Sequence, residues 1–143
     1  MLYPNKPIKV KLDEGAFQID YANEYAAGID IRSPKSICLW PHSQVKIDTG
    51  VHVEIPEDFC GLLVSKSGLN IKHGITSTGL IDPDYRGSIV VSLYNDSDTA
   101  YHINAGDKIT QMLMLPRYSF RIEETDTLSE TERGDKGFGS TGR

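Results

Sequence analysis

The stretch VKIDTGVHVEI, residues 45–55, decides the fold class of this 143-residue chain. Apolar or β-branched residues occupy its odd positions from Val45 to Ile55, and polar residues or glycine occupy its even positions. A period of two is typical of a strand with one buried face, whereas a helix needs a period of 3.6. The stretch therefore predicts a long half-buried strand that is bent or bulged at Gly50.

Shorter segments with the same alternation lie on both sides of this strand. Their alternating residues are Ile8/Val10/Leu12, Ile89/Val91/Leu93, Ile109/Gln111/Leu113/Leu115 and Tyr118/Phe120/Ile122. Turn-forming sequences such as SPKS, WPHS, PED, NDSD and NAGD separate them. Many short strands with this spacing predict an all-β barrel or sandwich. The helical candidate is residues 65–74, SKSGLNIKHG, with Ser67 as its expected cap and Gly74 as its expected end.

The C-terminal third of the chain contains two segments of opposite character. Residues 108–116, KITQMLMLP, are apolar on nearly both faces, which predicts either a central core strand or a subunit interface. After Ile122 the sequence becomes poor in apolar residues and rich in Ser, Thr and Gly, which is typical of a detachable arm. We therefore expect a β-barrel domain over residues 1–123 and a flexible Gly-rich arm over residues 124–143.

Composition excludes several classes of function. The net charge of −5 and pI of about 5.3 argue against nonspecific binding to nucleic acid or membrane surfaces, which requires a basic face. A protein with this net charge can still bind an anion such as a nucleotide, but only where its few cationic side chains lie close together. The N-terminus has no apolar signal core, and no stretch approaches the length of a membrane span. Cys38 and Cys60 are expected as buried thiols, and the histidines show no metal spacing.

GLIDPDYRGS, residues 79–88, places two carboxylates, a tyrosine and an arginine close together. One interpretation is a solvated β-hairpin in which Asp82 and Asp84 form turns. The functional interpretation makes one aspartate a general base and Tyr85 a flat wall against a substrate ring. The residues of this segment alone leave both interpretations open.

AAGIDIRS, residues 26–33, carries a second candidate carboxylate. Gly28 leaves room for a close backbone approach, and Asp30 lies between two isoleucines in a strand-like pattern. If the isoleucines face inward, Asp30 faces the opposite surface. There it is either simply solvated or holds a hard cation such as Mg²⁺, directly or through water.

Two further segments carry groups that suit phosphate. SKSGLN, residues 65–70, offers backbone N–H groups, a hydroxyl and an ammonium, although Ser-Gly is common in loops. At the C-terminus, Ser140 and Thr141 carry hydroxyl groups that can donate hydrogen bonds to phosphate. Phe138, flanked by glycines, can lie flat on a base, and such stacking is worth about 1–3 kcal/mol.

Five motifs in order resemble those of the trimeric dUTP diphosphatases (dUTPases): AAGIDIRS, SKSGLN, GLIDPDYRGSI, GDKITQM and RGDKGFGSTG. The resemblance covers nearly the whole chain. It implies a distorted, jelly-roll-like β-barrel assembled as a homotrimer, with active sites shared between chains and closed by a C-terminal arm. It also implies hydrolysis of dUTP to dUMP and diphosphate with Mg²⁺, which provides dUMP for thymidylate synthesis and keeps uracil out of DNA. The expected location is the cytoplasm, or the host cytoplasm if a phage or virus encodes the chain.

The resemblance also implies roles for residues at matching positions. Asp82 matches the base that activates water for attack on the α-phosphorus, Gln111 a residue that holds that water or the α-phosphate, and Ser67 the serine near the α,β-bridging oxygen. Asp30 matches the residue that orients Mg²⁺ through water, and Tyr85 the ring under the deoxyribose. The backbone of residues 79–81 matches the segment that recognises uracil. In the arm, Phe138 matches the aromatic residue that covers uracil, and Arg133, Ser140 and Thr141 match residues that bind the γ-phosphate. The implied substrate-binding residues are therefore Lys66, Ser67, Gly68, Thr76, Gly79, Leu80, Ile81, Asp82, Tyr85, Arg133, Phe138, Gly139, Ser140 and Thr141.

Three positions depart from the family pattern. Lys66 stands where arginine is common and lacks the guanidinium fork. Lys136 stands where a glycine is usual, and Thr76 or Ser77 stands where an asparagine is often found.

Other functions fit the sequence less well. A dCTP deaminase, which shares the fold, needs a glutamate near Ser92 and lacks the aromatic arm. An inactive regulatory or partner-binding relative would have lost Asp82 or the arm, although a regulatory protein partner in addition to catalysis stays open. An all-β scaffold with a loose tail leaves the five ordered motifs as coincidence.

Overall fold

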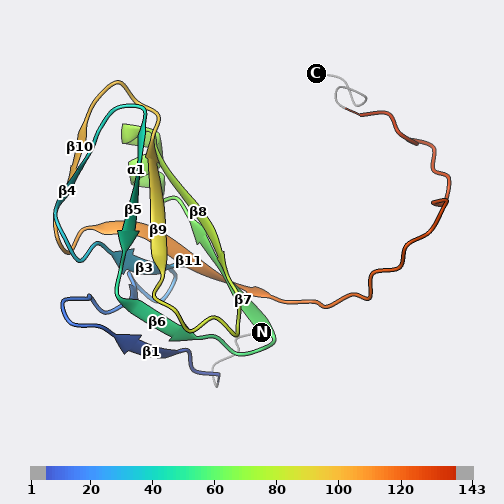
Figure 1. The fold of residues 1–143 in the computed structure, drawn as a ribbon, viewed down its shortest axis with the longest axis horizontal. Coiled ribbons are helices and arrows are strands. Elements are labelled where there is room, and N and C mark those ends of the chain that lie inside the picture. Colours follow the sequence, from blue (N-terminus) through green and yellow to red (C-terminus); the bar gives the residue numbers. More distant parts are fainter. Residues whose placement is uncertain (1–5, 138–143) are drawn as a thin grey trace.

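The computed structural model describes residues 6–137, which form eleven strands and one short helix (Figure 1). In chain order the elements are β1 (Lys9–Leu12), β2 (Asp20–Tyr21), β3 (Ile29–Arg32), β4 (Ile37–Leu39), β5 (Ser43–Asp48), β6 (Val51–Glu54), β7 (Phe59–Val64), α1 (Ser67–His73), β8 (Ile75–Ile81), β9 (Val90–Asn95), β10 (Tyr101–Ile103) and β11 (Lys108–Pro116). The predicted all-β fold is confirmed. Within the described ranges, no helix has the length and apolar character that crossing a membrane requires.

The strands form one large twisted sheet and two small ones. The large sheet has the order β2-β3-β11-β7-β8-β9-β5, while β1 pairs with β6 and β4 pairs with β10. Every pairing is antiparallel. β11 lies between β3 and β7, so the last strand of the described residues joins early and central parts of the chain (Figure 1).

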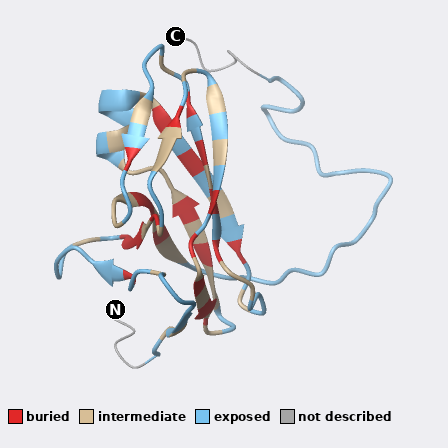
Figure 2. Cartoon of the chain, turned by 60° about the vertical axis from the view of Figure 1, so that its left-hand side comes forward, coloured by how far each residue is buried: buried red, intermediate tan, exposed pale blue. Residues whose placement is uncertain are grey.

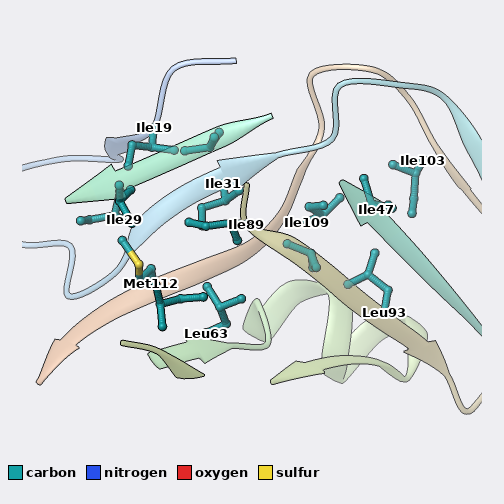
Figure 3. Close-up of a cluster of buried hydrophobic side chains, with 14 of the residues drawn as sticks. Ile19, Ile29, Ile31, Ile47, Leu63, Ile89, Leu93, Ile103, Ile109 and Met112 are labelled. Carbon is teal, nitrogen blue, oxygen red and sulfur yellow. The ribbon is translucent and has the colours of Figure 1, made fainter. Parts of the chain in front are cut away.

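Side chains from most strands meet in one hydrophobic core (Figure 3). Burying one such side chain stabilises the fold by about 1.5–3 kcal/mol. The largest fully buried members are Ile31, Leu39, Ile47, Leu63, Ile75, Ile89, Leu93, Ile103, Ile109 and Met112.

The stretch at residues 45–55 forms β5 and β6 with a bend between them, as predicted. Gly50 has φ 68°, a conformation that L side chains rarely adopt, so the alternating pattern is interrupted there. Ile47 and Val51 on either side of the bend are both fully buried. Thr49 is buried as well, and its hydroxyl donates to the Ile89 carbonyl at 2.7 Å, which satisfies the polar group.

β11 is a central strand, but its predicted faces were wrong. The register shifts between Lys108 and Thr110, so Ile109 and Thr110 are both buried in succession. Beyond this bulge Met112 faces the core, and Gln111 and Leu113 face outward. A one-residue irregularity exchanges the two faces of a strand, which a strict period of two does not anticipate.

The predicted strand over residues 118–122 is absent. Tyr118, Phe120 and Ile122 are 78–91% exposed, and no strand of the described chain pairs with them. Alternation alone does not form a strand without a partner for its backbone groups. Residues 117–137 are exposed throughout and run away from the barrel (Figures 1 and 2).

The helix prediction was correct at one end and wrong at the other. Gly74 ends α1 in the left-handed region, with φ 65°, and its N–H donates to the Asn70 carbonyl. At the start, Lys66 occupies the capping position with extended backbone, and no side chain caps the helix. Ser67 is therefore the first helical residue and not the cap. Cys38 and Cys60 are free thiols, half-buried instead of fully buried.

Candidate functional site

The first half of the candidate site surrounds the Asp30 carboxylate on β3. Asp30 points away from the core, as the alternation predicted, but its side chain is only 3% exposed. The Lys66 ammonium donates to Oδ1, and Lys108 Nζ lies 2.6 Å from Oδ2. A solvated carboxylate is therefore the wrong description of Asp30.

The electrostatic balance keeps Asp30 charged. Burial alone would raise the pKa of the carboxyl, because it removes the charge from water. The hydrogen bonds from Lys108 and Lys66, together with their positive charges, outweigh burial and hold the pKa of Asp30 below its usual value. Asp30 is thus an ionised, fixed carboxylate at neutral pH.

Gln111 lies beside Asp30, because the two residues are paired across β11 and β3. Its Nε2 donates to the Ser65 carbonyl at 3.2 Å. A Cβ placed on Gly28 would lie 2.7 Å from Gln111 Oε1 and 3.0 Å from Gln111 Cβ, so a larger residue there would displace the Gln111 side chain. Asp30, Lys66 and Gln111 are therefore brought together, with Ser67 next to Lys66 in the chain.

A buried hydroxyl network supports this half of the site. Ser65 Oγ donates to the Ser77 carbonyl and accepts from the Ser77 N–H at 2.9 Å. Ser77 Oγ lies 2.7 Å from Thr110 Oγ1, which donates to the Val64 carbonyl. The network ties β8 and β11 to the end of β7, where the segment of Lys66 begins.

The second half of the site is the turn that follows β8. Asp82 is exposed, and its carbonyl accepts from the Tyr85 N–H at 3.1 Å, with Pro83 at the position that favours such a turn. Tyr85 donates its hydroxyl to the Ser88 carbonyl at 2.9 Å. The turn and the functional interpretations of this segment are thus compatible, because the turn holds Asp82 and Tyr85 in place.

Side chains of the β5–β6 region anchor this loop. His52 Nδ1 lies 2.7 Å from the Arg86 carbonyl and Nε2 lies 3.0 Å from Asp13 Oδ2. The contact with the Arg86 carbonyl, followed by the contact with Asp13, raises the pKa of His52. Ser88 Oγ donates to Asp48, which lowers the pKa of that carboxyl. The loop is held at its C-terminal end by two side chains of the neighbouring strands.

Asp82 opens onto a cavity of about 780 Å³, which Arg86 and Arg117 also line. Beside it, β8 separates from β9. The two strands pair only over Ile75–Ser77, whereas β8 stays paired with β7 through Ile81. Backbone groups of Gly79–Ile81 that point toward β9 thus have no ladder partner in the described chain. Thr76 lies in the paired part, opposite Tyr94.

One chain does not bring the two halves together. Asp30 is paired with Gln111, Gln111 with Val64, and Val64 with Thr78, four residues before Asp82. Strand spacing and rise therefore put Asp30 and Asp82 roughly 20 Å apart along the sheet. Between them lies a leucine row, in which Leu62 pairs with both Leu80 and Leu113.

The remaining predicted residues lie in α1 and the arm. Gly68 lies in the first turn of α1 and is exposed. Arg133 is exposed, and its Nε donates to the Lys136 carbonyl at 3.1 Å. Phe138, Gly139, Ser140 and Thr141 lie outside the described residues. Lys108 was not predicted as a site residue. Its position in the motif GDKITQM was the signal that could have identified it.

The donors around Asp30 limit how a metal ion can bind. Both carboxylate oxygens already face an ammonium group, which disfavours direct coordination. Residues 6–137 contain no group of three or more His, Cys, Asp or Glu side chains that suits a metal ion. The donor set fits a contact through a metal-bound water.

Comparisons with known proteins agree on one family. The dUTPase family model matches residues 16–142. The chain is 39% identical to deoxyuridine 5'-triphosphate nucleotidohydrolase of Clostridium novyi, over 92% of this chain and 95% of that protein. It is 40% identical to the protein of the same name from Rhizobium leguminosarum, over 94% and 91%.

Solved structures give the same result. The dUTPase of Staphylococcus bacteriophage 80alpha with dUpNHpp has a TM-score of 0.88 and 30% identity, covering 96% of this chain and 99% of that one. A mutant dUTPase from phage phi11 of S. aureus, described with a coordinated structural Mg(II) ion, has a TM-score of 0.80 and 26% identity, covering 87% and 100%.

Proposed function

This chain belongs to the dUTPase family, and we propose on that basis that it hydrolyses dUTP to dUMP and diphosphate. The observation that carries the proposal is the family match over residues 16–142, which spans both halves of the candidate site. Asp82 and Tyr85 lie in an anchored turn, and Asp30, Lys66 and Gln111 form a fixed polar cluster.

The separation of the two halves supports a homotrimer with shared active sites. Leu80 is 62% exposed in the leucine row, and Leu115 on β11 is 37% exposed. Such an apolar strip between two polar sites is unfavourable in water and marks a surface that another chain covers. Packing of this strip between copies would bring the Asp82 turn of one chain toward the Asp30 cluster of another.

In this site Asp82 acts as the general base. Its exposed carboxylate removes a proton from the water that attacks the α-phosphorus, a role worth about 10²–10⁴-fold in rate. Gln111 has one N–H committed to the Ser65 carbonyl and a second available for that water or the α-phosphate. The Ser67 hydroxyl donates to the α,β-bridging oxygen, where negative charge develops as the bond breaks.

Mg²⁺ is the proposed cofactor, and Asp30 would hold it through a water molecule. When bound, the ion neutralises charge on the triphosphate and favours attack at phosphorus. The fixed, ionised Asp30 carboxylate suits this contact because it accepts hydrogen bonds without a change of protonation state.

Base and sugar recognition fall to the second half of the site and the arm. The unpaired backbone edge at Gly79–Ile81 suits the edge of uracil, since fixed donors and acceptors reject the wrong base. The Tyr85 ring lies under the deoxyribose. The arm, residues 124–143, supplies Phe138 for the base, and Arg133, Ser140 and Thr141 for the γ-phosphate.

Diphosphate release from dUTP, dCTP, dTTP and UTP with Mg²⁺ tests the proposal. We expect dUTP to be strongly preferred, and Asp82→Asn to lower its turnover by about a hundredfold or more. Asp84→Asn, a change to an exposed carboxylate of the same turn, is the matched control and keeps most of the activity. Similar turnover of all four nucleotides, equal effects of the two variants, or ammonia release from dCTP would contradict the proposal.

A further inference from the structure

Two lysines far apart in the sequence converge on one buried carboxylate. Lys66 precedes α1 and Lys108 begins β11, yet their ammonium groups contact the two different oxygens of Asp30. The Asp30 side chain is 3% exposed, whereas those of Lys66 and Lys108 are 27% and 31% exposed. The carboxylate is thus inside, and the two cations lie between it and solvent.

The cluster carries more positive charge than its fold requires. Two ammonium groups and one carboxylate leave a net charge of +1. One cation would compensate the buried carboxylate, and the second adds a desolvation cost that the pairing with Asp30 does not need. Each ammonium has three donors and gives one to Asp30. Among residues 6–137, Asp30 is the one acidic side chain that forms an ion pair with either lysine.

Arg32 is a third cation near the cluster, but it does not add to the excess positive charge around Asp30. It is paired with Lys108 across β3 and β11. However, its Nη1 donates to the Gly106 carbonyl at 3.0 Å, and its Nη2 lies 3.8 Å from Asp20. The guanidinium is already directed to partners in the same chain, while the side chains of Lys66 and Lys108 stay partly exposed and, among residues 6–137, form ion pairs with Asp30 alone.

We propose that Lys108 is a substrate-binding residue, which forms with Lys66 a pair of ammonium groups that binds the polyphosphate of dUTP. Asp30 serves as the fixed anchor that holds both groups at one place. The inference rests on the proposed function, because the ligand of the pair is the substrate of that reaction. A triphosphate carries about two more negative charges than a monophosphate at neutral pH, so loss of one cation should weaken triphosphate binding selectively.

The test measures the binding of dUpNHpp and of dUMP by titration calorimetry, with Mg²⁺ and again in EDTA. Lys108→Gln keeps a hydrogen bond to Asp30 and removes the charge; Lys108→Arg keeps the charge. One charge-assisted contact predicts about tenfold or more weaker binding of dUpNHpp by Lys108→Gln. We expect a change of less than about twofold for dUMP, and near wild-type binding by Lys108→Arg. Lys46→Gln, at an exposed strand lysine of β5, is the control and should change neither ligand.

The outcomes separate this inference from the proposed function. Wild-type protein that neither binds dUpNHpp nor hydrolyses dUTP would refute the proposed function. An active wild type with unchanged dUpNHpp binding by Lys108→Gln would refute the role of Lys108 alone. Equal losses of affinity for dUpNHpp and dUMP, or a loss that appears with Mg²⁺ but not in EDTA, would also refute the role of Lys108. If Lys108→Gln does not fold, the double variant Asp30→Asn/Lys108→Gln, which also removes the buried negative charge, should show the same loss in EDTA. Unchanged binding of dUpNHpp by this variant would overturn the inference.

Discussion

Among single residues, His52 links the Asp82 loop to the β1–β6 pair. Its two ring nitrogens face the Arg86 carbonyl and the Asp13 carboxylate, and both of these groups are hydrogen-bond acceptors. Only the doubly protonated ring donates to both at once. Lys11 and Asp48 are the other charged groups near the ring. The pKa of Asp48 is lowered mainly by its hydrogen bond from Ser88 and also by the positive charge of His52.

The pH dependence of stability tests this role of His52. Because folding raises the pKa of His52, its contribution to stability is fully present below the unfolded pKa of about 6.5. It is lost as the pH rises through the higher folded pKa. We expect His52→Gln to lower the melting temperature most near pH 5.5, with the difference from wild type narrowing toward pH 9. His102→Gln, at an exposed position on β10, should lack this trend; a constant difference for His52→Gln would contradict the assignment.

Asp30 shows how far sequence reasoning reaches for one residue. The alternation IDI correctly placed its side chain on the face opposite Ile29 and Ile31. Its burial and its second lysine were not predictable, because Lys108 reaches it only through the pairing of β11 with β3. A local pattern contains the direction of a side chain but not its distant partners.

At the scale of elements, local signals predicted strands better than their faces. The period of two located β5, β6, β9 and β11, and Gly50 marked the bend. The bulge at Lys108–Thr110 exchanged the faces of β11, since the extra residue is set by pairing with β3. The alternation at residues 118–122 did not produce a strand, because the described chain offers it no partner.

Truncation of the arm is the prediction at this scale. Residues 117–137 contribute no buried side chain, so deletion of residues 133–143 should leave the melting temperature nearly unchanged. Loss of Phe138 and Arg133 should lower dUTP turnover by about tenfold or more, since one base–aromatic stack alone is worth about 1–3 kcal/mol. Arg121→Ala, an exposed position just before the arm, is the control. Full activity of the truncated protein would show that the arm is not a working part of the site.

In the whole molecule, one chain holds the two halves of the candidate site apart. The motifs pointed to Asp30, Lys66 and Gln111 in one half and to Asp82 and Tyr85 in the other, but not to Lys108. The separation of the halves along the sheet depends on strand order, which no motif contains. The partly exposed leucine row between them supports assembly into a homotrimer, and light scattering should give three times 15.9 kDa.

Complementation between inactive variants tests the shared site most directly. Asp82→Asn keeps the Asp30 half intact, and Asp30→Asn keeps the Asp82 half intact. Mixed by unfolding and refolding at equal amounts, the two variants should form hybrid sites that combine both intact halves. With one half from each of two neighbouring chains, about a quarter of the sites in a closed ring should be active, although each variant alone is not. Wild-type protein unfolded and refolded in the same way sets full activity; a mixture no more active than its separate components would contradict a site shared between chains.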